Sequence, residues 1–469
     1  MALNTNAPLQ REMLLELIKE APEAVVSLIL NMQEALVALR AEVGKLQERI
    51  AELEAQNRPP SAPFRRSAEE RKTDPKKPGR REGHSGSCRK VPEVVDEVIE
   101  VNLECCPQCR GALIGVMPVV QYIEELPPVR PQVTRLTTYE GHCLKCDEVV
   151  RSVHPRQTST AGGCAGVQLG ARAVAVAAEL KHRLGLTLRK TCDVLQLLGG
   201  LKVSAGGLVQ AFARAARKVA PEEAALVSQL QNSPVVHADE TSWWKNNASC
   251  SLWVFGSPGP KGVTLYRVVD HRDRTTFHSV IAPDYPGILI SDCLSVYDTA
   301  TDRQHKCYAH HLRALKEAVK NQSPQVAAVD RWLEEVRGFF EHAMDFKKRI
   351  AALDPAHIAL ERQGLEVRAN ELFANPRGDP AQESFRNRIA KQRDHLLVFL
   401  DHPMAGATNN FAERQLRGAV IARKLSCGNK TDHGASTWQT LASLAATCHQ
   451  QLKNFSDFLA PRLFLPTEG

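Results

Sequence analysis

The first regular pattern of apolar positions lies near the N-terminus. From Val25 to Leu53 apolar residues recur at alternating steps of four and three, which is the spacing of a heptad repeat. The pattern predicts one long helix, and its mostly β-branched a positions with leucine-rich d positions favour a parallel dimer. The alternative is an amphipathic helix that packs on its own domain. The a positions are Ile29, Leu36, Val43 and Ile50, and the d positions are Met32, Leu39, Leu46 and Leu53.

Pro59-Pro60 ends this helix, and the stretch that follows, to about residue 92, lacks an apolar pattern. Residues 93 to 155 contain short runs typical of strands, EVVDEVIEVN and VTRLTTYEGH. From 168 to 220 the spacing is helical, with glycine-containing turns between helices and Ser204 as the expected cap of the last one. This arrangement fits a helix-turn-helix DNA reader, and it also fits an ordinary pack of three helices.

From residue 234 the pattern changes to that of strands. The runs PVVHADETSW, SLWVFGS and GVTLYRVVD are followed by a short helix near 275–282 and then by GILISD. Three strands, a helix and another strand predict a mixed α/β sheet. HKCYAHHLRALKEAVK predicts a further short strand that runs into a helix, residues 324–400 are helical and charged, and two more helices follow. We therefore expect a multidomain α+β protein.

Composition narrows the class of protein. The chain has 469 residues, enough for two to four domains, and its 43% hydrophobic content allows a real core. It has no run of about 18 apolar residues and no basic-then-apolar signal at its N-terminus, so we expect a soluble, cytoplasmic protein. Thirteen cysteines, an odd number spread along the chain, do not resemble a secreted disulfide framework.

The net charge of +7 is unevenly distributed. Residues 58–90 carry eleven Lys/Arg against four Asp/Glu, so this segment alone matches the excess of the whole chain. A localised basic run predicts a polyanion partner, and a solvated linker is the alternative. The candidate DNA contacts in this segment are Lys76, Lys77, Arg80 and Arg81.

Two cysteine pairs have the spacing of a metal site. Cys106 and Cys109 form the first CxxC pair, Cys143 and Cys146 form the second, and 33 residues separate them. Four thiolates suit the tetrahedral preference of Zn²⁺, so the sequence predicts a structural zinc ribbon. A redox or fortuitous pairing is the alternative, and Cys105 is a spare thiol beside the first pair.

Two acids follow apolar strand patterns in the predicted sheet. Asp239 ends the first strand and Asp292 ends the fourth, so their carboxylates lie side by side if these strands are neighbours. Like charges held close together raise each other's pKa and destabilise the fold unless a cation neutralises them, and hard oxygen ligands suit Mg²⁺. Glu240 is expected to point to the opposite face from Asp239, so that only one of the two joins this site.

A third acid, Glu413, lies in the segment NNFAERQLR. A capping box with Asn410 and an i,i+4 pair with Arg417 give it a structural explanation. Its functional interpretation rests on the cations that follow it, because an acid beside several cations suits a metal site that faces a phosphodiester backbone. The candidate DNA contacts here are Arg414, Arg417, Arg423 and Lys424.

The order of these motifs resembles the IS66 family of bacterial insertion-sequence transposases over nearly the whole chain. The motifs are the coiled coil, the basic linker, the paired CxxC, the helical segment, HADETSW, ISDCLSVYD, CYAHHLR and NNFAERQLR. The resemblance implies an RNase H-like catalytic domain of the DDE type, interrupted by a helical insertion, whose triad is Asp239, Asp292 and Glu413. Cys293-Leu294 departs from the small or Gly-containing pair common in the family, and Arg110 stands where glycine is usual.

The same resemblance implies a mechanism. The triad holds two Mg²⁺ ions, which Mn²⁺ can replace, in an in-line displacement at phosphorus. Hydrolysis exposes a 3′-hydroxyl at each element end, and that hydroxyl then attacks target DNA. The expected partners are the terminal inverted repeats, target DNA, a second copy or a higher homo-oligomer, and small accessory proteins of the same element, with no membrane. The expected location is the bacterial cytoplasm, in association with the nucleoid.

Other interpretations stay open. The chain could be a non-catalytic zinc and coiled-coil DNA-binding regulator, or an RNase H-like nuclease that cuts without joining. Trp243 and Trp244 could stack on a displaced base, pack in the core or lie at an edge. Cys307 and His310, spaced as CxxH, resemble a metal half-site, with a structural or DNA-adjacent role as the alternative.

Together these expectations divide the chain into seven segments. They are a coiled-coil dimerisation helix (1–57), a basic linker (58–92), a zinc-ribbon DNA-binding domain (93–155), a helix-turn-helix-like DNA-binding segment (165–222), the first part of the catalytic core (233–322), a helical insertion (323–400), and the remainder of the core with the third-acid helix and the C-terminal helices (401–469).

Overall fold

The structure is a computed structural model of the chain. Its residues fall into two units, Met1–Tyr122 and Ile123–Gly469. The candidate DNA contacts Lys76, Lys77, Arg80 and Arg81 lie outside the residues that the structure describes. None of the described helices is long and apolar enough to cross a membrane. The described residues are 18–19, 22–56, 89–127, 129–160, 166–298 and 300–465.

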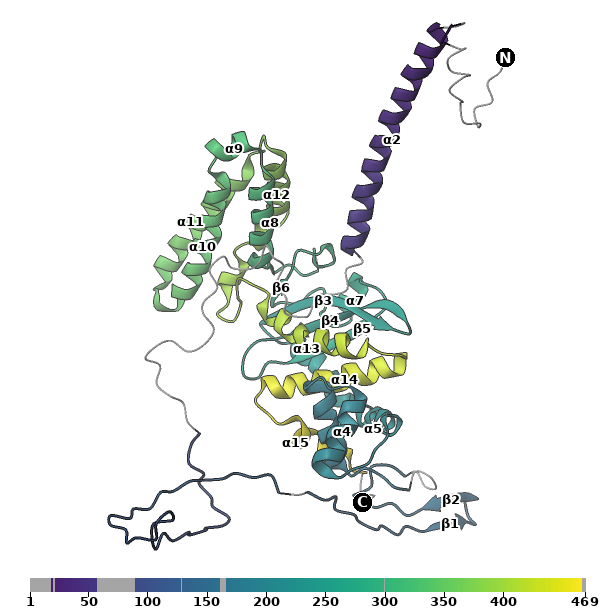
Figure 1. Cartoon of the computed structure of the whole chain (residues 1–469), viewed down its shortest axis with the longest axis vertical. Coiled ribbons are helices and arrows are strands. Elements are labelled where there is room, and N and C mark those ends of the chain that lie inside the picture. The colour runs from purple at the N-terminus through teal and green to yellow at the C-terminus, as the bar shows by residue number, and fades with distance from the viewer. Residues whose placement is uncertain are drawn as a thin grey trace. The chain divides into compact units, whose positions relative to one another are not determined.

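The first unit contains one long helix, α2 (Pro22–Gln56), where the heptad pattern predicts it (Figure 1). The side chains of Met32, Leu36, Leu39, Val43 and Leu46, which belong to the a and d positions, are all exposed. An apolar stripe along a helix is stable in water when another surface covers it. The helix itself is therefore as the sequence predicts, and its pairing with a second copy stays a prediction.

The strands expected around the cysteine pairs are mostly absent. The run EVVDEVIEVN pairs with no other strand among the described residues, and its residues are exposed, so that prediction is wrong. VTRLTTYEGH forms a strand only at its end, where β1 (Glu140–Cys143) pairs antiparallel with β2 (Glu148–Arg151). A run of β-branched residues becomes a strand only if a second strand satisfies its backbone groups, and the composition of the run does not supply that partner.

A five-stranded mixed sheet forms the centre of the second unit, as the sequence predicts. The strand order is β5-β4-β3-β6-β7. β3 pairs antiparallel with β4, and β4 pairs antiparallel with β5, whereas β6 pairs parallel with both β3 and β7. The short helix α7 (Arg274–His278) lies between β5 and β6 in sequence and so connects the antiparallel part of the sheet to its parallel part. The strands are β3 (Val235–Lys245), β4 (Ala248–Gly256), β5 (Thr264–Val269), β6 (Ile288–Ser291) and β7 (Gln304–Lys306).

Among the helices that precede the sheet in sequence, α6 (Ala220–Gln231) contacts β5, and α5 (Ala205–Lys218) packs against α14 (Asp432–Gln450), which itself lies along β5. Ser204 caps α5 as predicted, because its Oγ accepts a hydrogen bond from the Gly207 N–H at 3.1 Å. Leu208 and Phe212 of α5 are buried in the same apolar cluster as Trp253 of β4. These helices thus form part of the core of the sheet. They are α3 (Ala171–Ala178), the π-helical turn η2 (Glu179–Arg183), α4 (Leu188–Gly199), α5 (Ala205–Lys218) and α6 (Ala220–Gln231).

One face of the sheet is covered by α13 (Asn410–Ser426) and by α14 (Asp432–Gln450) around Trp438 and Ala442. Trp243 is buried there, 4.7 Å from Trp438 between ring centroids, and its indole N–H donates to Asn429 Oδ1 at 2.9 Å. Trp243 is therefore a core residue. Trp244, its neighbour in β3, points the other way and is 48% exposed.

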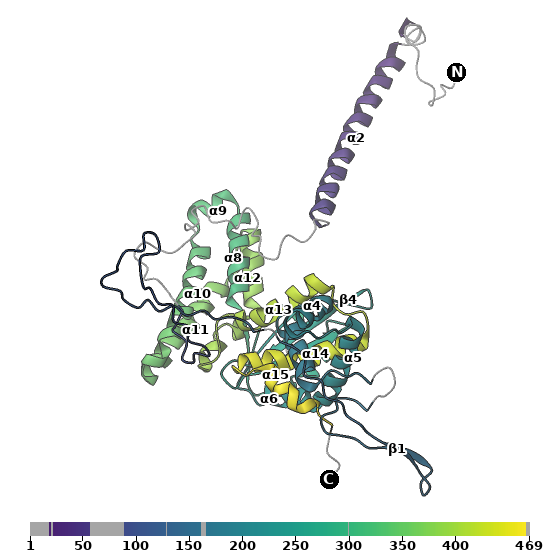
Figure 2. The same cartoon turned by 60° about the horizontal axis from the view of Figure 1, so that its bottom comes forward.

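A helical bundle is inserted between β7 and α13. Figures 1 and 2 show its long helices side by side, to one side of the sheet. The bundle has its own core around Phe340 and Phe385, and this core continues to Ile288 and Ile290 of β6 through Tyr308 at the start of α8. Its helices are α8 (Tyr308–Asn321), α9 (Pro324–Val329), α10 (Trp332–Arg349), α11 (Pro355–Ala374) and α12 (Pro380–Ala390).

A row of side chains on α14 closes the free edge of the sheet at β5. Gln439 Oε1, Ser443 Oγ and Thr447 Oγ1 lie one turn apart on this helix. They accept hydrogen bonds from the backbone N–H groups of Val268, Tyr266 and Thr264, at 3.0, 2.8 and 3.0 Å. A strand edge exposes unpaired N–H groups, and here a row of helix side chains satisfies them.

Replacing Thr447 by valine tests this edge. Thr447 Oγ1 accepts from the Thr264 N–H and donates to the Thr264 carbonyl, both at 3.0 Å, and both residues are buried. Thr447→Val keeps the shape but leaves two buried backbone groups unpaired, so we expect it to lower the free energy of unfolding by about 1–3 kcal/mol in urea titrations followed by fluorescence. Thr437→Val, the same change on the same helix at a side chain for which the described residues provide no hydrogen-bond partner, is the control. Equal stabilities of the two variants would show that the edge bonds contribute nothing.

Candidate active site

The parallel pairing of β3 with β6 brings two acids to one edge of the sheet. The pairing joins residues 235–237 to residues 288–290, and Asp292 directly follows the end of β6. Asp239 lies two residues beyond the last pair, and β3 continues past it to Lys245, so the expectation that Asp239 ends its strand is wrong. A carboxylate oxygen of Asp239 and one of Asp292 lie within 4.8 Å of each other. The two acids therefore lie side by side.

Glu240 joins these two aspartates, which the sequence did not predict. One of its carboxylate oxygens lies within 4.8 Å of those of Asp239 and Asp292. The side chain does project from the other face of β3, where its carboxylate accepts from the Tyr297 O–H at 2.5 Å and pairs with Arg272. Alternation still holds along β3. Because β6 is no longer paired with β3 at this point, no strand separates the two faces, and both side chains reach the same edge.

The electrostatics of the site reflect the crowding of these acids. Burial and the negative charges of Glu240, Asp292 and Glu413 together raise the pKa of Asp239 to about 7, against the lowering effect of the Glu240 N–H. Burial also raises the pKa of Glu240, and the Asp292 charge adds to this effect, whereas Tyr297 and Arg272 oppose it. A bound cation stabilises the charged forms of carboxylates that are held this close together, so the donor set fits a hard divalent ion.

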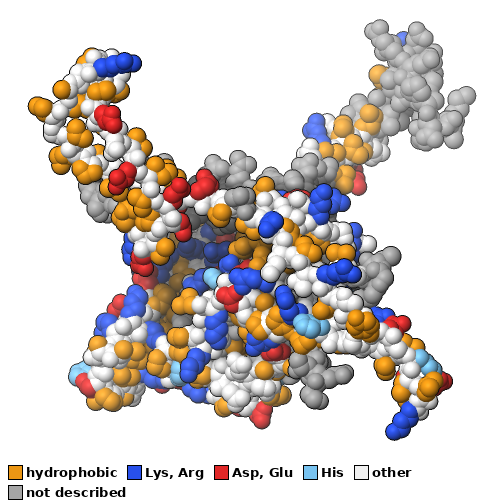
Figure 3. Space-filling model, turned by 90° about the horizontal axis from the view of Figure 1, so that it is seen from below, with side chains coloured by type: hydrophobic (Ala, Val, Ile, Leu, Met, Phe, Trp, Pro, Cys, Tyr) orange, Lys and Arg blue, Asp and Glu red, His pale blue; other side chains and the backbone are white. Residues whose placement is uncertain are grey.

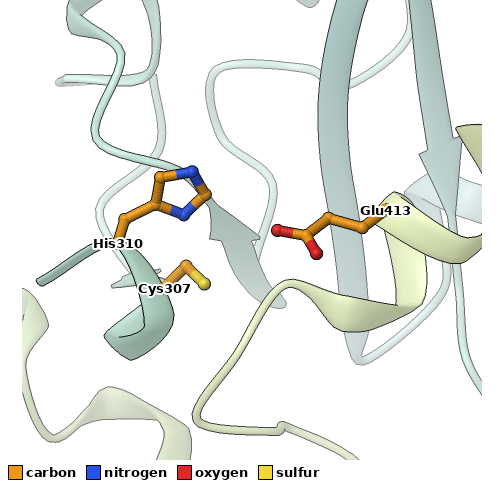
Figure 4. Close-up of side chains that lie close together, drawn as sticks. All are labelled: Cys307, His310 and Glu413. Atoms are coloured by element: carbon orange, nitrogen blue, oxygen red, sulfur yellow. The ribbon is translucent and has the colours of Figure 1, made fainter. Parts of the chain in front are cut away.

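Glu413 lies in the first turn of α13, close to the two aspartates but grouped with other side chains. Its carboxylate lies within 4.8 Å of Cys307 Sγ and of a ring nitrogen of His310 (Figure 4). Its Oε1 is also 3.7 Å from the Arg313 guanidinium. The structural explanation based on Asn410 and Arg417 is wrong: the cap of α13 is Asn409, and among the described residues Glu413 forms no ion pair with Arg417.

Asn409, a residue that the sequence did not predict to be important, joins the elements that carry the acids. Its Nδ2 donates to the Ala238 carbonyl at 2.8 Å, and its Oδ1 lies 3.0 Å from His237 Nδ1. Burial lowers the pKa of His237 to about 4, so the ring is neutral and Nδ1–H donates to this oxygen. The Asn409 N–H also donates to Cys307 Sγ at 3.1 Å. The doubled asparagine before an expected helix was the available signal, and it was assigned to the wrong asparagine.

A buried lysine lies beneath the acids. Lys306 of β7 is fully buried, and its Nζ lies 3.5 Å from Asp298 Oδ1 and 3.4 Å from Ser291 Oγ. The same ammonium lies 5.5 Å from the centre of the ring of Tyr297, whose hydroxyl donates to Glu240. This network holds Glu240 in place. Lys306 lies in the motif HKCYAHHLR and Tyr297 in ISDCLSVYD, but their burial and their contacts are not local properties of these motifs.

Comparison with known proteins places the chain in a family. The model of the transposase IS66 family matches residues 166–437, which include the sheet, the bundle and α13. The chain belongs to the IS66 family of transposases. Two relatives from Sinorhizobium fredii (strain NBRC 101917 / NGR234) have names that state no activity. Uncharacterized protein y4qI is 23% identical over 425 residues, 84% of this chain and 75% of that protein. Uncharacterized protein y4jO is 24% identical over 181 residues, 38% of this chain and 54% of that protein.

The four candidate DNA contacts of the transposase on α13 differ in what they touch. Arg423 donates to Thr241 Oγ1 at 3.2 Å and to Ser242 Oγ at 2.7 Å, so it links α13 to β3 by side-chain hydrogen bonds. Arg414, Arg417 and Lys424 are exposed. Arg417 and Lys424 are seven residues apart, nearly two turns, and therefore share a face of the helix. Other Lys and Arg side chains are spread among apolar ones on the surface in Figure 3.

The two CxxC pairs of the transposase, one in each unit, form the same turn. The Arg110 N–H donates to the Cys106 carbonyl and the Asp147 N–H donates to the Cys143 carbonyl, both at 2.8 Å. The N–H groups of Cys109 and Gln108 lower the pKa of the Cys106 thiol, and those of Cys146 and Lys145 lower that of Cys143. Thiols that ionise readily are suited to bind Zn²⁺. The spare thiol of Cys105 is exposed.

Arg110 departs from the family pattern at a strained position of this turn. Its φ is 58°, and that of Asp147, the equivalent residue of the second turn, is 57°. This left-handed conformation favours glycine, because a side chain at Cβ crowds the backbone. The arginine is therefore accommodated at some cost in stability.

The junction at Asn409 can be tested by a pair of neighbouring variants. Asn409→Ala leaves the Ala238 carbonyl and the His237 ring nitrogen unpaired in a buried place, so we expect the free energy of unfolding to fall by about 1–3 kcal/mol. Asn410→Ala is the matched control, because Asn410 is exposed, and we expect a change within about 0.5 kcal/mol. Urea titration measures both. A similar loss of stability in the two variants would contradict a specific role of Asn409.

Proposed function

We propose that this transposase cuts DNA at the ends of its insertion sequence and joins those ends to target DNA by a DDE mechanism. The observation that carries the proposal is the meeting of the Asp239 and Asp292 carboxylates within 4.8 Å at the end of the parallel strand pair. Glu413, in the first turn of α13, is the third acid, and its charge already acts on Asp239. The three carboxylates would hold two Mg²⁺ ions, which Mn²⁺ can replace.

An RNase H-like catalytic core is part of this proposal. It is supported by the strand order β5-β4-β3-β6-β7, with three antiparallel strands followed by two parallel ones. The first acid is on the central strand and the second follows the adjacent parallel strand. The helical bundle between β7 and α13 is the insertion that separates the second acid from the third.

The residues of the chain contribute binding, orientation and charge. When bound, the ions supply the Lewis acidity that activates a water or a 3′-hydroxyl and stabilises the leaving oxygen. Asp239 and Asp292 provide oxygen ligands on a rigid sheet edge, and Arg272 and Tyr297 fix Glu240 beside them. Arg414 and Arg417 face solvent within about one turn of Glu413, Lys424 faces solvent further along the same helix, and all three contact backbone phosphates. One phosphodiester is exchanged for another, so the reaction needs no further cofactor.

The N-terminal segments serve end recognition and pairing in this proposal. The two CxxC pairs bind one structural Zn²⁺ through Cys106, Cys109, Cys143 and Cys146, and the basic linker with Lys76, Lys77, Arg80 and Arg81 contacts DNA. Together with the helical segment 165–222 they recognise the terminal inverted repeats. The coiled coil pairs two copies, so that both ends are held together, and small proteins of the same element assist. The reaction takes place on the DNA of the bacterial nucleoid in the cytoplasm.

A cleavage and joining assay tests the catalytic proposal. Full-length protein is incubated with element-end DNA and Mg²⁺, and the products are separated by size. We expect cleaved and joined products from the unmodified protein and a loss of at least about a thousandfold for Asp292→Ala, because removal of a metal ligand removes transition-state charge stabilisation.

Asp284→Ala is the control, since Asp284 is an exposed acid outside both metal groupings. Cleaved products without joined products would identify a nuclease. Specific binding of end DNA without any cleavage would identify a regulator.

The coiled coil is tested by a charge placed in its seam. Leu39 is at a d position and Ala41 at the outward f position of the same heptad. We expect Leu39→Glu to convert dimers to monomers in size-exclusion chromatography with light scattering, because a buried carboxylate between two helices has no partner. Ala41→Glu should leave the mass unchanged. If Leu39→Glu has the same mass as the unmodified protein, the zipper does not form the dimer.

A further inference from the structure

A cysteine, a histidine and the third acid meet beside the two aspartates. Cys307 caps the N-terminus of α8, and His310 lies in the first turn of that helix. One ligand atom of each of Cys307, His310 and Glu413 lies within 4.8 Å of the other two. Figure 4 shows the Glu413 carboxylate, which comes from α13, directed toward the sulfur and the imidazole. These three side chains are called the Cys-His-Glu cluster below.

The cluster has a ligand atom that packing does not explain. His310 Nδ1 is buried and has no hydrogen-bond partner among the described residues, although a buried ring nitrogen is costly to leave unpaired. The Arg313 guanidinium lies 3.7 Å from Glu413, but its side chain is 62% exposed, and such surface pairs contribute little. The Glu413 carboxylate is therefore available to a stronger partner.

The surroundings of the cluster act on its thiol in both directions. Burial raises the pKa of the Cys307 thiol and the Glu413 charge adds to this effect, whereas backbone N–H groups oppose it, among them that of Asn409, which donates to Sγ at 3.1 Å. The helices α8 and α13 both begin at the cluster. Their N-termini are the positive ends of the helix dipoles, which favour a thiolate and a carboxylate. Sulfur, imidazole nitrogen and carboxylate oxygen together are the donors that Zn²⁺ prefers over Mg²⁺, with a fourth position left for water.

We propose that the Cys-His-Glu cluster is a second metal site, for a thiophilic divalent ion such as Zn²⁺, and that this ion competes with catalytic Mg²⁺ for Glu413. The competition rests on the proposed function, since it requires Glu413 to serve the two aspartates during catalysis. One carboxylate cannot serve both positions fully, so an ion in the cluster keeps the third acid away from Asp239 and Asp292. By linkage, each metal then weakens the binding of the other by the same factor.

Binding of Co²⁺ to the full-length protein tests the site without any activity measurement. Co²⁺ replaces Zn²⁺ and gives a sulfur-to-metal charge-transfer absorption when a thiolate is a ligand. We expect Cys307→Ser and His310→Gln each to bind one Co²⁺ per chain fewer than the unmodified protein. His310→Gln covers the case in which Cys307→Ser fails to fold, which circular dichroism reveals.

Two controls separate the cluster from other thiols and histidines. Cys192→Ser removes a half-buried thiol of α4 that belongs to neither metal grouping of the described residues. His342→Gln removes a histidine whose Nε2 lies 3.0 Å from Glu361 Oε1 and which belongs to neither metal grouping of the described residues. Both should retain the full Co²⁺ stoichiometry, and the four CxxC thiols are common to every variant. If Cys307→Ser and His310→Gln bind as much Co²⁺ as the controls do, the site does not exist.

The competition is tested by adding Mg²⁺ to the same titration. We expect Mg²⁺ to raise the Co²⁺ midpoint of the cluster about tenfold in the unmodified protein and to have no such effect in Asp292→Asn. An unchanged midpoint in the unmodified protein would overturn the competition. A failure of the proposed function is distinguishable from these results, because it appears as absent Mg²⁺-dependent cleavage while the Co²⁺ difference between the variants remains.

Discussion

The parallel pairing of β3 with β6 is the constraint on which the rest of the site depends. It places Asp239 and Asp292 at the same edge of the sheet, and it ends early enough for Glu240 to reach that edge from the other face. The cost of crowding these acids appears in the raised pKa of Asp239. The surrounding structure sustains this cost, because Arg272, Tyr297 and the buried Lys306 place donors and positive charge around the carboxylates.

The position of the third acid is set by contacts between helices and the sheet. Asn409 binds the strand that carries Asp239 and the cysteine that begins α8, so the start of α13 is held against both elements. Glu413 therefore lies between the sheet edge that carries the aspartates and the first turn of the inserted bundle. The bundle begins next to this acid, since its first helix, α8, carries Cys307 at its N-cap, His310 and Arg313.

The sheet also shows how one helix can serve two purposes. One side of α14 packs Trp438 against Trp243 in the core, and another side supplies Gln439, Ser443 and Thr447 to the edge of β5. The sheet is thereby closed on the side away from β6 and β7. The acids lie on the other side of the central strand, at the end of its pairing with β6.

The local features followed from the sequence alone: the helix α2, the cap at Ser204, the strands of the mixed sheet, and the identity of the acids and cysteines. These features depend on periodicity and on short spacings, which are properties of neighbouring residues. Tertiary contacts determined the absence of a strand at EVVDEVIEVN, the edge reached by Glu240, the hydrogen bonds of Asn409 and the meeting of Glu413 with Cys307 and His310. Each depends on where a pairing ends, or on which distant segment lies opposite, and no local pattern contains that information.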